Sequence, residues 1–284
     1  MTIIQAVVLG LVQGLTEFMP VSSSAHLIII PWLFHWDDPG LAYDVALHLG
    51  TLFALLWYFR SDWARLVRAG IDSIRERKIS GDIDRRLVWF LIIATIPGVI
   101  IGLLAEGRIE ELFHQPGAAH GNVAMIALAV VIALLGAVLF IVERVARHRR
   151  RLDQITLNDS MIIGLAQGLA IFPGVSRSGS TITAGLALGL QRETAARFSF
   201  LLSTPIILSA GLKSIYDLSG ELAVGATVQI DWLAYTIGFI TAALSGYLCI
   251  RFLLRFLQQH TTDVFVYYRW ALAVLVIVVV FVRG

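Results

Sequence analysis

The chain has 284 residues, of which 57% are hydrophobic and 15% are charged, and its formal net charge is +2. An ordinary soluble domain carries about 25% charged residues, so this chain lacks the polar surface of a soluble enzyme, a disordered protein or a nucleic-acid-binding protein. Cys249 is the single cysteine, which excludes an intrachain disulfide and argues against a thiolate metal site. The composition predicts an all-α polytopic membrane protein.

The first half of the chain, residues 1–146, begins with an interrupted apolar segment. Residues 1–35 contain Pro20 in the middle, and each part is too short for the about 20 residues that cross a bilayer. We expect a re-entrant helical hairpin whose irregular break is covered by protein or by a water-filled cavity. Three transmembrane spans are expected to follow, at about 42–59, 87–105 and 122–143.

The second half, residues 157–284, repeats this organisation. Its interrupted segment, 157–190, is expected to form a second re-entrant hairpin, and the spans after it lie at about 196–213, 232–252 and 266–282. Residues 10–24 align without gaps on residues 164–178, with nine of fifteen positions identical. Because an odd number of spans separates the hairpins, we expect an inverted-topology repeat within one membrane domain, with a site near the bilayer midplane. A duplication kept only for packing is the alternative.

The basic residues predict the orientation of the chain. Seventeen lie in the segments 60–86, 144–151, 192–197 and 251–255, against three on the opposite side, Arg108, Lys213 and Arg283. Loops rich in Lys and Arg face the cytoplasm. Both termini are therefore expected outside the cytoplasm, with the first hairpin entering from the outer face and the second from the inner face.

Charged side chains inside apolar segments are costly and indicate function. Those that remain after the loop residues are set aside are Glu17, His26, His48 and Arg177, with Asp44 near the end of a span. Glu17, His26 and Arg177 belong to the repeated motif and its immediate extension. His48 and Asp44 carry a weaker signal, since His48 is explained by packing as readily as by function.

In the first copy of the motif, Gln13 and Glu17 are four residues apart and share a helix face. The helix is expected to break at Pro20 and the next one to start near Ser22–Ser24, because serines are good N-caps. Free N–H groups at a helix N-terminus favour an anion. His26 lies on the first turn of that second helix, close to the same point.

The second copy places an arginine in the equivalent turn. The guanidinium of Arg177 can bind two phosphate oxygens, and Gly174 and Gly179 let the backbone approach a ligand closely. Ile171 stands where the first copy has Glu17. We therefore expect a phosphate site in which the first copy is catalytic and the second binds the anion.

The residues expected to bind the substrate phosphate are Ser22, Ser24, Ser176, Arg177, Ser178 and Gly179. Simpler interpretations stay open. Glu17 and Arg177 could form a structural ion pair that closes the two halves, His26 could be a core histidine, and each serine could act as a cap and no more.

The two stretches QGLTEFMPVSSSAH and PGVSRSGST resemble the undecaprenyl-diphosphate phosphatase family, also called bacitracin-resistance phosphatases, and the similarity extends along essentially the whole chain. The resemblance implies an integral membrane hydrolase that converts undecaprenyl diphosphate to undecaprenyl phosphate and inorganic phosphate. Such an enzyme recycles the lipid carrier for peptidoglycan synthesis in the bacterial inner membrane and confers resistance to bacitracin.

Carried over by position, the resemblance assigns the catalytic residues Glu17, Ser23, His26 and Arg177. It also implies a divalent cation, Mg²⁺ or Ca²⁺, with Glu17 as a ligand and Gln13 nearby. Gln13 departs from family members that have a second glutamate there, which puts a site built on two carboxylates in doubt. The implied partners are an isoprenyl diphosphate lipid and membrane lipids, with no nucleic acid and with a homodimer left open.

The mechanistic hypothesis has Ser23 or His26 attacking the terminal phosphorus, or activating water against it. Arg177 and the helix N-termini stabilise the charge on the phosphoryl oxygens, and Glu17 orients His26 or holds the cation. The site is expected to open to the extracytoplasmic face. A lipid-phosphate flippase that uses the same midplane anion site is the rival function, and a non-catalytic scaffold leaves the buried charges unexplained.

Overall fold

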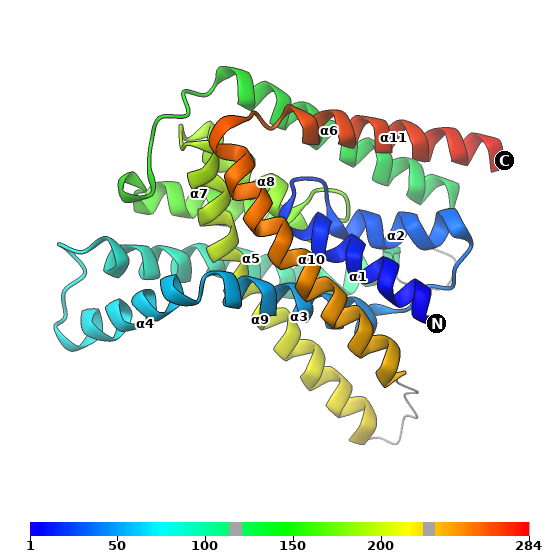
Figure 1. Cartoon of the computed structure of the whole chain (residues 1–284), viewed down its shortest axis with the longest axis horizontal. Helices are drawn as coiled ribbons and strands as arrows, with labels where there is room; N and C mark the ends of the chain where they lie inside the picture. Colours follow the sequence, from blue (N-terminus) through cyan, green and yellow to red (C-terminus); the bar gives the residue numbers. More distant parts are fainter. Residues whose placement is uncertain (114–120, 224–230, 284) are drawn as a thin grey trace.

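The computed structural model describes residues 1–113, 121–223 and 231–283, and these residues fold into helices α1 to α11 and two short 3₁₀ turns, without a β-sheet (Figure 1). The prediction of an all-α protein is confirmed. Gly284, the last residue of the predicted second half, lies outside the described residues.

The two interrupted segments form the expected helical hairpins. The first consists of α1 (Ile3–Phe18) and α2 (Ser23–Phe34). Met19 is extended and ends α1, because the proline that follows it disfavours helical backbone at the residue before it. The second consists of α7 (Leu157–Gly168), the 3₁₀ turn η2 (Leu169–Ile171) and α8 (Arg177–Ala187).

The predicted spans correspond to helices whose bounds are Leu41–Tyr58 for α3, Ile83–Phe113 for α5, Asn122–Val145 for α6, Arg192–Ala223 for α9, Trp232–Gln259 for α10 and Asp263–Arg283 for α11. In the described part, five helices are long and apolar enough to cross a membrane. A sixth span is counted if α3 and α4 (Arg60–Arg75), which meet at a bend of 78°, are taken together. All of these helices except α3 are longer than the predicted spans, because helical backbone continues beyond the apolar stretch.

Helix α4 corrects one expectation, since residues 60–86 were expected to be a connecting loop. One side of this helix is buried, at positions Asp62, Leu66, Ala69 and Ser73, which follow helical periodicity. The indole of Trp89 on α5 donates a hydrogen bond to Ser73 Oγ at 2.8 Å. The many arginines of this segment hide its amphipathic pattern, and four of them, Arg60, Arg65, Arg68 and Arg75, lie on α4, which packs against α5.

The two halves interlock. Helix α1 packs mainly on α10 of the second half, and α7 packs mainly on α5 of the first. Glycines allow both approaches: a Cβ at Gly10 would lie 2.7 Å from the backbone oxygen of Gly238, and a Cβ at Gly164 would lie 2.3 Å from that of Ala94. Gly10 and Gly164 are equivalent in the sequence repeat, so both copies use the same kind of contact. The inversion of the halves relative to a membrane stays a prediction.

Figure 1 shows the N- and C-termini toward the same end of the molecule, away from the turn that joins α4 to α5. Helices α6 and α11 lie side by side and α10 crosses the molecule diagonally. The breaks of the two hairpins, residues 19–22 and 172–176, lie between the helical segments that carry them. A side-chain hydrogen bond joins them, because Ser178 Oγ at the start of α8 donates to the carbonyl oxygen of Met19 at 2.8 Å.

Candidate active site

Both breaks end in the same local structure. Ser22 and Ser176 are the N-caps of α2 and α8, and both adopt a positive φ, 74° and 72° respectively. Their hydroxyls accept hydrogen bonds from the backbone N–H groups of Ala25 at 3.4 Å and Gly179 at 3.0 Å. The predicted helix start near Ser22–Ser24 is confirmed. A positive φ is costly for serine, and such strain is found mainly at functional sites.

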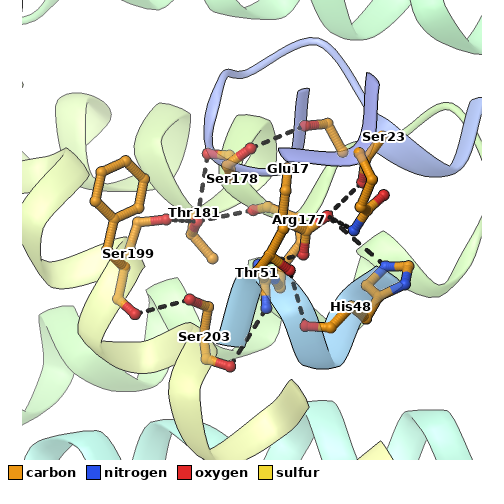
Figure 2. A network of polar contacts seen from close by, with 12 residues as sticks. Glu17, Ser23, His48, Thr51, Arg177, Ser178, Thr181, Ser199 and Ser203 are labelled. Atoms are coloured by element: carbon orange, nitrogen blue, oxygen red, sulfur yellow. Dashed lines mark hydrogen bonds and ion pairs between the residues drawn. The ribbon is translucent and has the colours of Figure 1, made fainter. Parts of the chain in front are cut away.

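Glu17, near the end of α1, lies at the centre of the site (Figure 2). Its Oε1 accepts a hydrogen bond from Arg177 Nη2 at 2.8 Å, and its Oε2 accepts from Ser23 Oγ at 2.5 Å and from Gln13 Nε2 at 3.1 Å. The Glu17 side chain is only 5% exposed. The structure therefore brings together four of the predicted residues, from α1, α2 and α8.

Arg177 has a second contact that fixes the direction of its guanidinium. Its Nη1 donates to the backbone oxygen of Ser203 on α9 at 3.3 Å. Thr181, one helical turn after Arg177, donates to the Arg177 carbonyl oxygen and also shares a hydrogen bond with Ser199 Oγ at 2.6 Å. These polar contacts from α9 were not predicted, and Figure 2 shows them on the side of Arg177 away from Ser23.

His48 on α3 also reaches the site. Its Nε2 lies 3.7 Å from Glu17 Oε2, and its Nδ1 lies 2.7 Å from the carbonyl oxygen of Asp44. A carbonyl only accepts hydrogen bonds, so Nδ1 carries the proton and Nε2 faces the carboxylate of Glu17. The His48 side chain is 32% exposed. Of the two interpretations of His48 drawn from the sequence, its position favours function.

His26 faces away from this cluster. Its Nδ1 lies 2.6 Å from the carbonyl oxygen of Ser22, and its Nε2 lies 2.7 Å from the hydroxyl of Tyr268 on α11. The rings of His26 and Tyr268 also stack at 5.6 Å. Both ring nitrogens thus have partners other than Ser23 and Glu17, and Ser23 bonds to the carboxylate. A catalytic role for His26 stays a prediction.

The remaining predicted phosphate-binding residues surround the two caps. Ser24 Oγ lies 3.2 Å from Ser22 Oγ, and Ser178 Oγ lies 3.3 Å from Ser176 Oγ, so the serine pairs of the two copies are arranged alike. Gly179 leaves space at the start of α8, where an added Cβ would lie 2.9 Å from Ser176 Cβ. The geometry collects hydroxyls and helix N-termini at both breaks, which together favour an anion.

Sequence reasoning overlooked Arg269. It lies inside the predicted span 266–282 and is 1% exposed, and its guanidinium donates to backbone carbonyls of both breaks. The signal was present, since an arginine within an apolar span indicates function. It was missed because basic residues were sorted by loop, and Arg269 lies in none.

For a cation, the site offers oxygen atoms and no preformed cluster. Within the described ranges, no group of three or more His, Cys, Asp or Glu side chains could hold a metal ion. The amide oxygen of Gln13, however, is buried without a hydrogen-bond partner, while the Gln13 nitrogen contacts Glu17. Mg²⁺ is commonly held by one or two carboxylates together with substrate phosphates, and this donor set fits such a site.

Comparison with known proteins identifies the family. The family model of bacitracin resistance protein BacA matches residues 6–275. This chain belongs to the BacA family. An undecaprenyl-diphosphatase of Moorella thermoacetica is 47% identical over 283 residues, covering 100% of both chains. An undecaprenyl-diphosphatase of Thermomicrobium roseum is 46% identical over 284 residues, covering 100% of both chains. A protein named undecaprenyl-diphosphatase 2, from Stutzerimonas stutzeri, is also 46% identical over 284 residues, covering 98% of both chains.

Proposed function

We propose that this BacA family member hydrolyses undecaprenyl diphosphate to undecaprenyl phosphate and inorganic phosphate. The names of its full-length relatives support this substrate. The observation that carries the proposal is the carboxylate of Glu17, which binds Arg177 with one oxygen and the Ser23 hydroxyl with the other. The guanidinium and the hydroxyl at two helix N-termini, with the carboxylate between them, supply an anion site, a nucleophile and a base in one place.

The ion pair between Glu17 and Arg177 holds the site ready for its substrate. The terminal phosphate of the diphosphate competes with Glu17 for the guanidinium, which can bind two phosphoryl oxygens at once. The N-termini of α2 and α8 add backbone N–H groups. Phosphoryl transfer depends chiefly on positioning and on stabilising the charge of the transferred group, which these donors supply.

The Ser23 hydroxyl donates its hydrogen bond to Glu17, so the proton has an acceptor when the oxygen reacts. Ser23 Oγ attacks the terminal phosphorus, its proton passes to Glu17, and the bond to the bridging oxygen breaks, which releases undecaprenyl phosphate. Water then hydrolyses the phosphoserine to inorganic phosphate. Attack by His26 or directly by water are the competing versions, and His48 stands beside Glu17 as a further proton acceptor.

The divalent cation, Mg²⁺ or Ca²⁺, is part of the proposal. Glu17 and the unpartnered amide oxygen of Gln13 would hold it, with the remaining ligands from the diphosphate. When bound, such an ion neutralises phosphate charge and polarises the phosphoryl oxygen. A reduction of activity by EDTA that Mg²⁺ or Ca²⁺ reverses supports this, and full activity in EDTA contradicts it.

The site is proposed to open to the extracytoplasmic face of the inner membrane. The uneven distribution of basic residues supports this orientation. Cysteine labelling of Ser24→Cys by an impermeant reagent added outside spheroplasts supports it, and labelling only from the cytoplasmic side contradicts it. The sequence leaves a homodimer open, and light scattering in detergent decides it.

The test of the activity is phosphate release from undecaprenyl diphosphate by the purified chain in detergent, with Arg177→Ala as the inactive control. Detergent micelles have no sides, so a flippase gives no signal in this assay. Release by the wild-type chain and its loss in Arg177→Ala support the phosphatase. Absence of release in the presence of Mg²⁺ and of Ca²⁺ contradicts it.

A further inference from the structure

Arg269 is an arginine on α11 that belongs to neither copy of the motif and is 1% exposed. A charge inside a membrane segment is costly unless its donors are satisfied. In the described part of the chain Arg269 forms no ion pair with a carboxylate, and all its hydrogen bonds go to backbone oxygens. A side chain with such partners holds in place the backbone segments whose carbonyl oxygens it binds.

The guanidinium of Arg269 joins three separate segments. Its Nε donates to the backbone oxygen of Ile132 on α6 at 3.0 Å. Its Nη1 donates to Pro20 in the first break at 3.1 Å, and its Nη2 donates to Gly174 in the second break at 2.7 Å and to Val175 at 3.4 Å. The guanidinium is a planar fork of five donors, so one side chain satisfies carbonyls on several sides.

The two breaks contact Arg269 at equivalent positions. Pro20 and Gly174 occupy the same place in the sequence repeat, 154 residues apart by the alignment of residues 10–24 on 164–178. Backbone that leaves the helix loses its internal partners, and within a membrane those carbonyls need donors from protein or water. Arg269 thus supplies the missing donor to both copies from one point between them.

The start of α8 leaves room for this arginine. A Cβ at Gly179 would lie 3.0 Å from Arg269 Nη1, tighter than ordinary contact. The equivalent position in the first copy is Ala25, so the repeat itself does not demand glycine there. The neighbouring residue on α11, Tyr268, holds His26 through its hydroxyl. One turn of α11 therefore contacts both hairpins.

We propose that Arg269 is a positioning residue that fixes the separation of the two breaks, and with it the placement of Ser23 and Arg177 around Glu17. Arg269 lies outside the cluster and acts through the backbone of the breaks. Catalysis is sensitive to small displacements of such groups, and a shift of about 1 Å can cost about 100-fold in rate. This inference rests on the proposed phosphatase function.

The test compares Arg269→Met, Arg269→Lys and Arg269→Ala with Arg283→Met. Arg283 is a matched control, because it lies on the same helix and also donates to carbonyls, those of Trp32 and Leu33, at the far end of α2. Methionine keeps much of the length without any donor, and lysine keeps the charge without the planar fork. The measurements are kcat and KM for undecaprenyl diphosphate, and hydrogen exchange at residues 19–23 and 173–177.

Arg269→Met is expected to lower kcat by about tenfold to 100-fold with little change in KM, and to raise hydrogen exchange at both breaks together. Arg269→Lys is expected to recover part of the rate, and guanidinium ion, but not sodium at equal ionic strength, to recover part of the activity of Arg269→Ala. Arg283→Met is expected to leave kcat and both breaks unchanged.

Two results overturn the inference: unchanged exchange at the breaks in Arg269→Met, or a loss of kcat that only follows the unfolded fraction and that guanidinium does not reverse. Absence of phosphate release by the wild-type chain is a different failure, because it contradicts the proposed function. In that case the exchange data alone decide whether Arg269 holds the breaks.

Discussion

Ser23 and Arg177 occupy the same position in the two copies of the motif, and they donate hydrogen bonds to different oxygens of the Glu17 carboxylate, Ser23 to Oε2 and Arg177 to Oε1. Each is the first residue of the helix that follows its break. The duplication therefore gives one carboxylate two unlike partners in similar places. The first copy supplies the hydroxyl of Ser23 and the second supplies the guanidinium of Arg177. This difference between the copies agrees with the expectation that the first is catalytic and the second binds the anion.

Glu17→Gln is expected to lower kcat by about 100-fold or more, since the amide cannot take the Ser23 proton and general base catalysis contributes about 10²–10⁴-fold. Phosphate release by detergent-purified protein measures it. Thr16→Ser, at a neighbouring position whose hydroxyl donates to the Val12 backbone oxygen, is the control and is expected to keep its rate. A rate for Glu17→Gln within a few-fold of wild type contradicts a role for this carboxylate.

Ser23→Ala is expected to abolish turnover and His26→Ala to leave measurable activity, because Ser23 contacts Glu17 whereas both nitrogens of His26 bind Ser22 and Tyr268. Rapid acid quench with substrate labelled at the terminal phosphate is expected to trap phosphoserine at Ser23. Phosphohistidine at His26, trapped in a parallel alkaline quench because its P–N bond is labile in acid, assigns the attack to the histidine instead. Residual activity in Ser23→Ala without any trapped intermediate favours attack by water.

The sequence was sufficient to predict both hairpins and their caps, because prolines and serines act locally. Pro20 breaks the first helix whatever the tertiary contacts around it, and Ser22 and Ser176 cap the helices that follow them. Long-range partners were not predictable in this way. The contact of His26 with Tyr268 joins residues 242 positions apart, and no periodicity or motif specifies which distant side chain a histidine contacts.

The loop expected at 60–86 shows a second limit. Counting arginines there predicted orientation, but charge content says little about whether a segment is helical, and α4 was missed although its buried positions are spaced at one helical turn. Arg269 was missed for a related reason, since basic residues were assigned to loops and this arginine lies inside the predicted span 266–282. Composition averages conceal residues whose importance comes from the contacts they make.

Gly179→Ala is expected to lower kcat without a matching loss of expression, because the added Cβ would lie 3.0 Å from Arg269 Nη1 and 2.9 Å from Ser176 Cβ, which displaces the guanidinium or the cap. The matched control is Ala25→Gly at the equivalent position of the first copy, expected to cost only about 0.5–1 kcal/mol of helix stability. Equal kcat values for Gly179→Ala and the wild type contradict the idea that Arg269 and the Ser176 cap need the space left by Gly179.

Glu143→Gln tests a contact that stabilises the fold away from the site. Glu143 is 6% exposed on α6, forms an ion pair with Arg192, and accepts hydrogen bonds from the backbone N–H and hydroxyl of Thr262. Breaking a buried pair by removing one charge costs about 3–5 kcal/mol, so a clear fall in the thermal unfolding temperature in detergent is expected.

Because Glu143 does not contact Glu17, Ser23 or Arg177, phosphate release per folded Glu143→Gln molecule is expected to stay at the wild-type rate below the transition. A loss of kcat in fully folded Glu143→Gln contradicts this separation of stability from catalysis. The exposed ion pair of Arg144 and Asp263 nearby provides the control. Asp263→Asn is expected to change the unfolding temperature little, because exposed ion pairs contribute little stability.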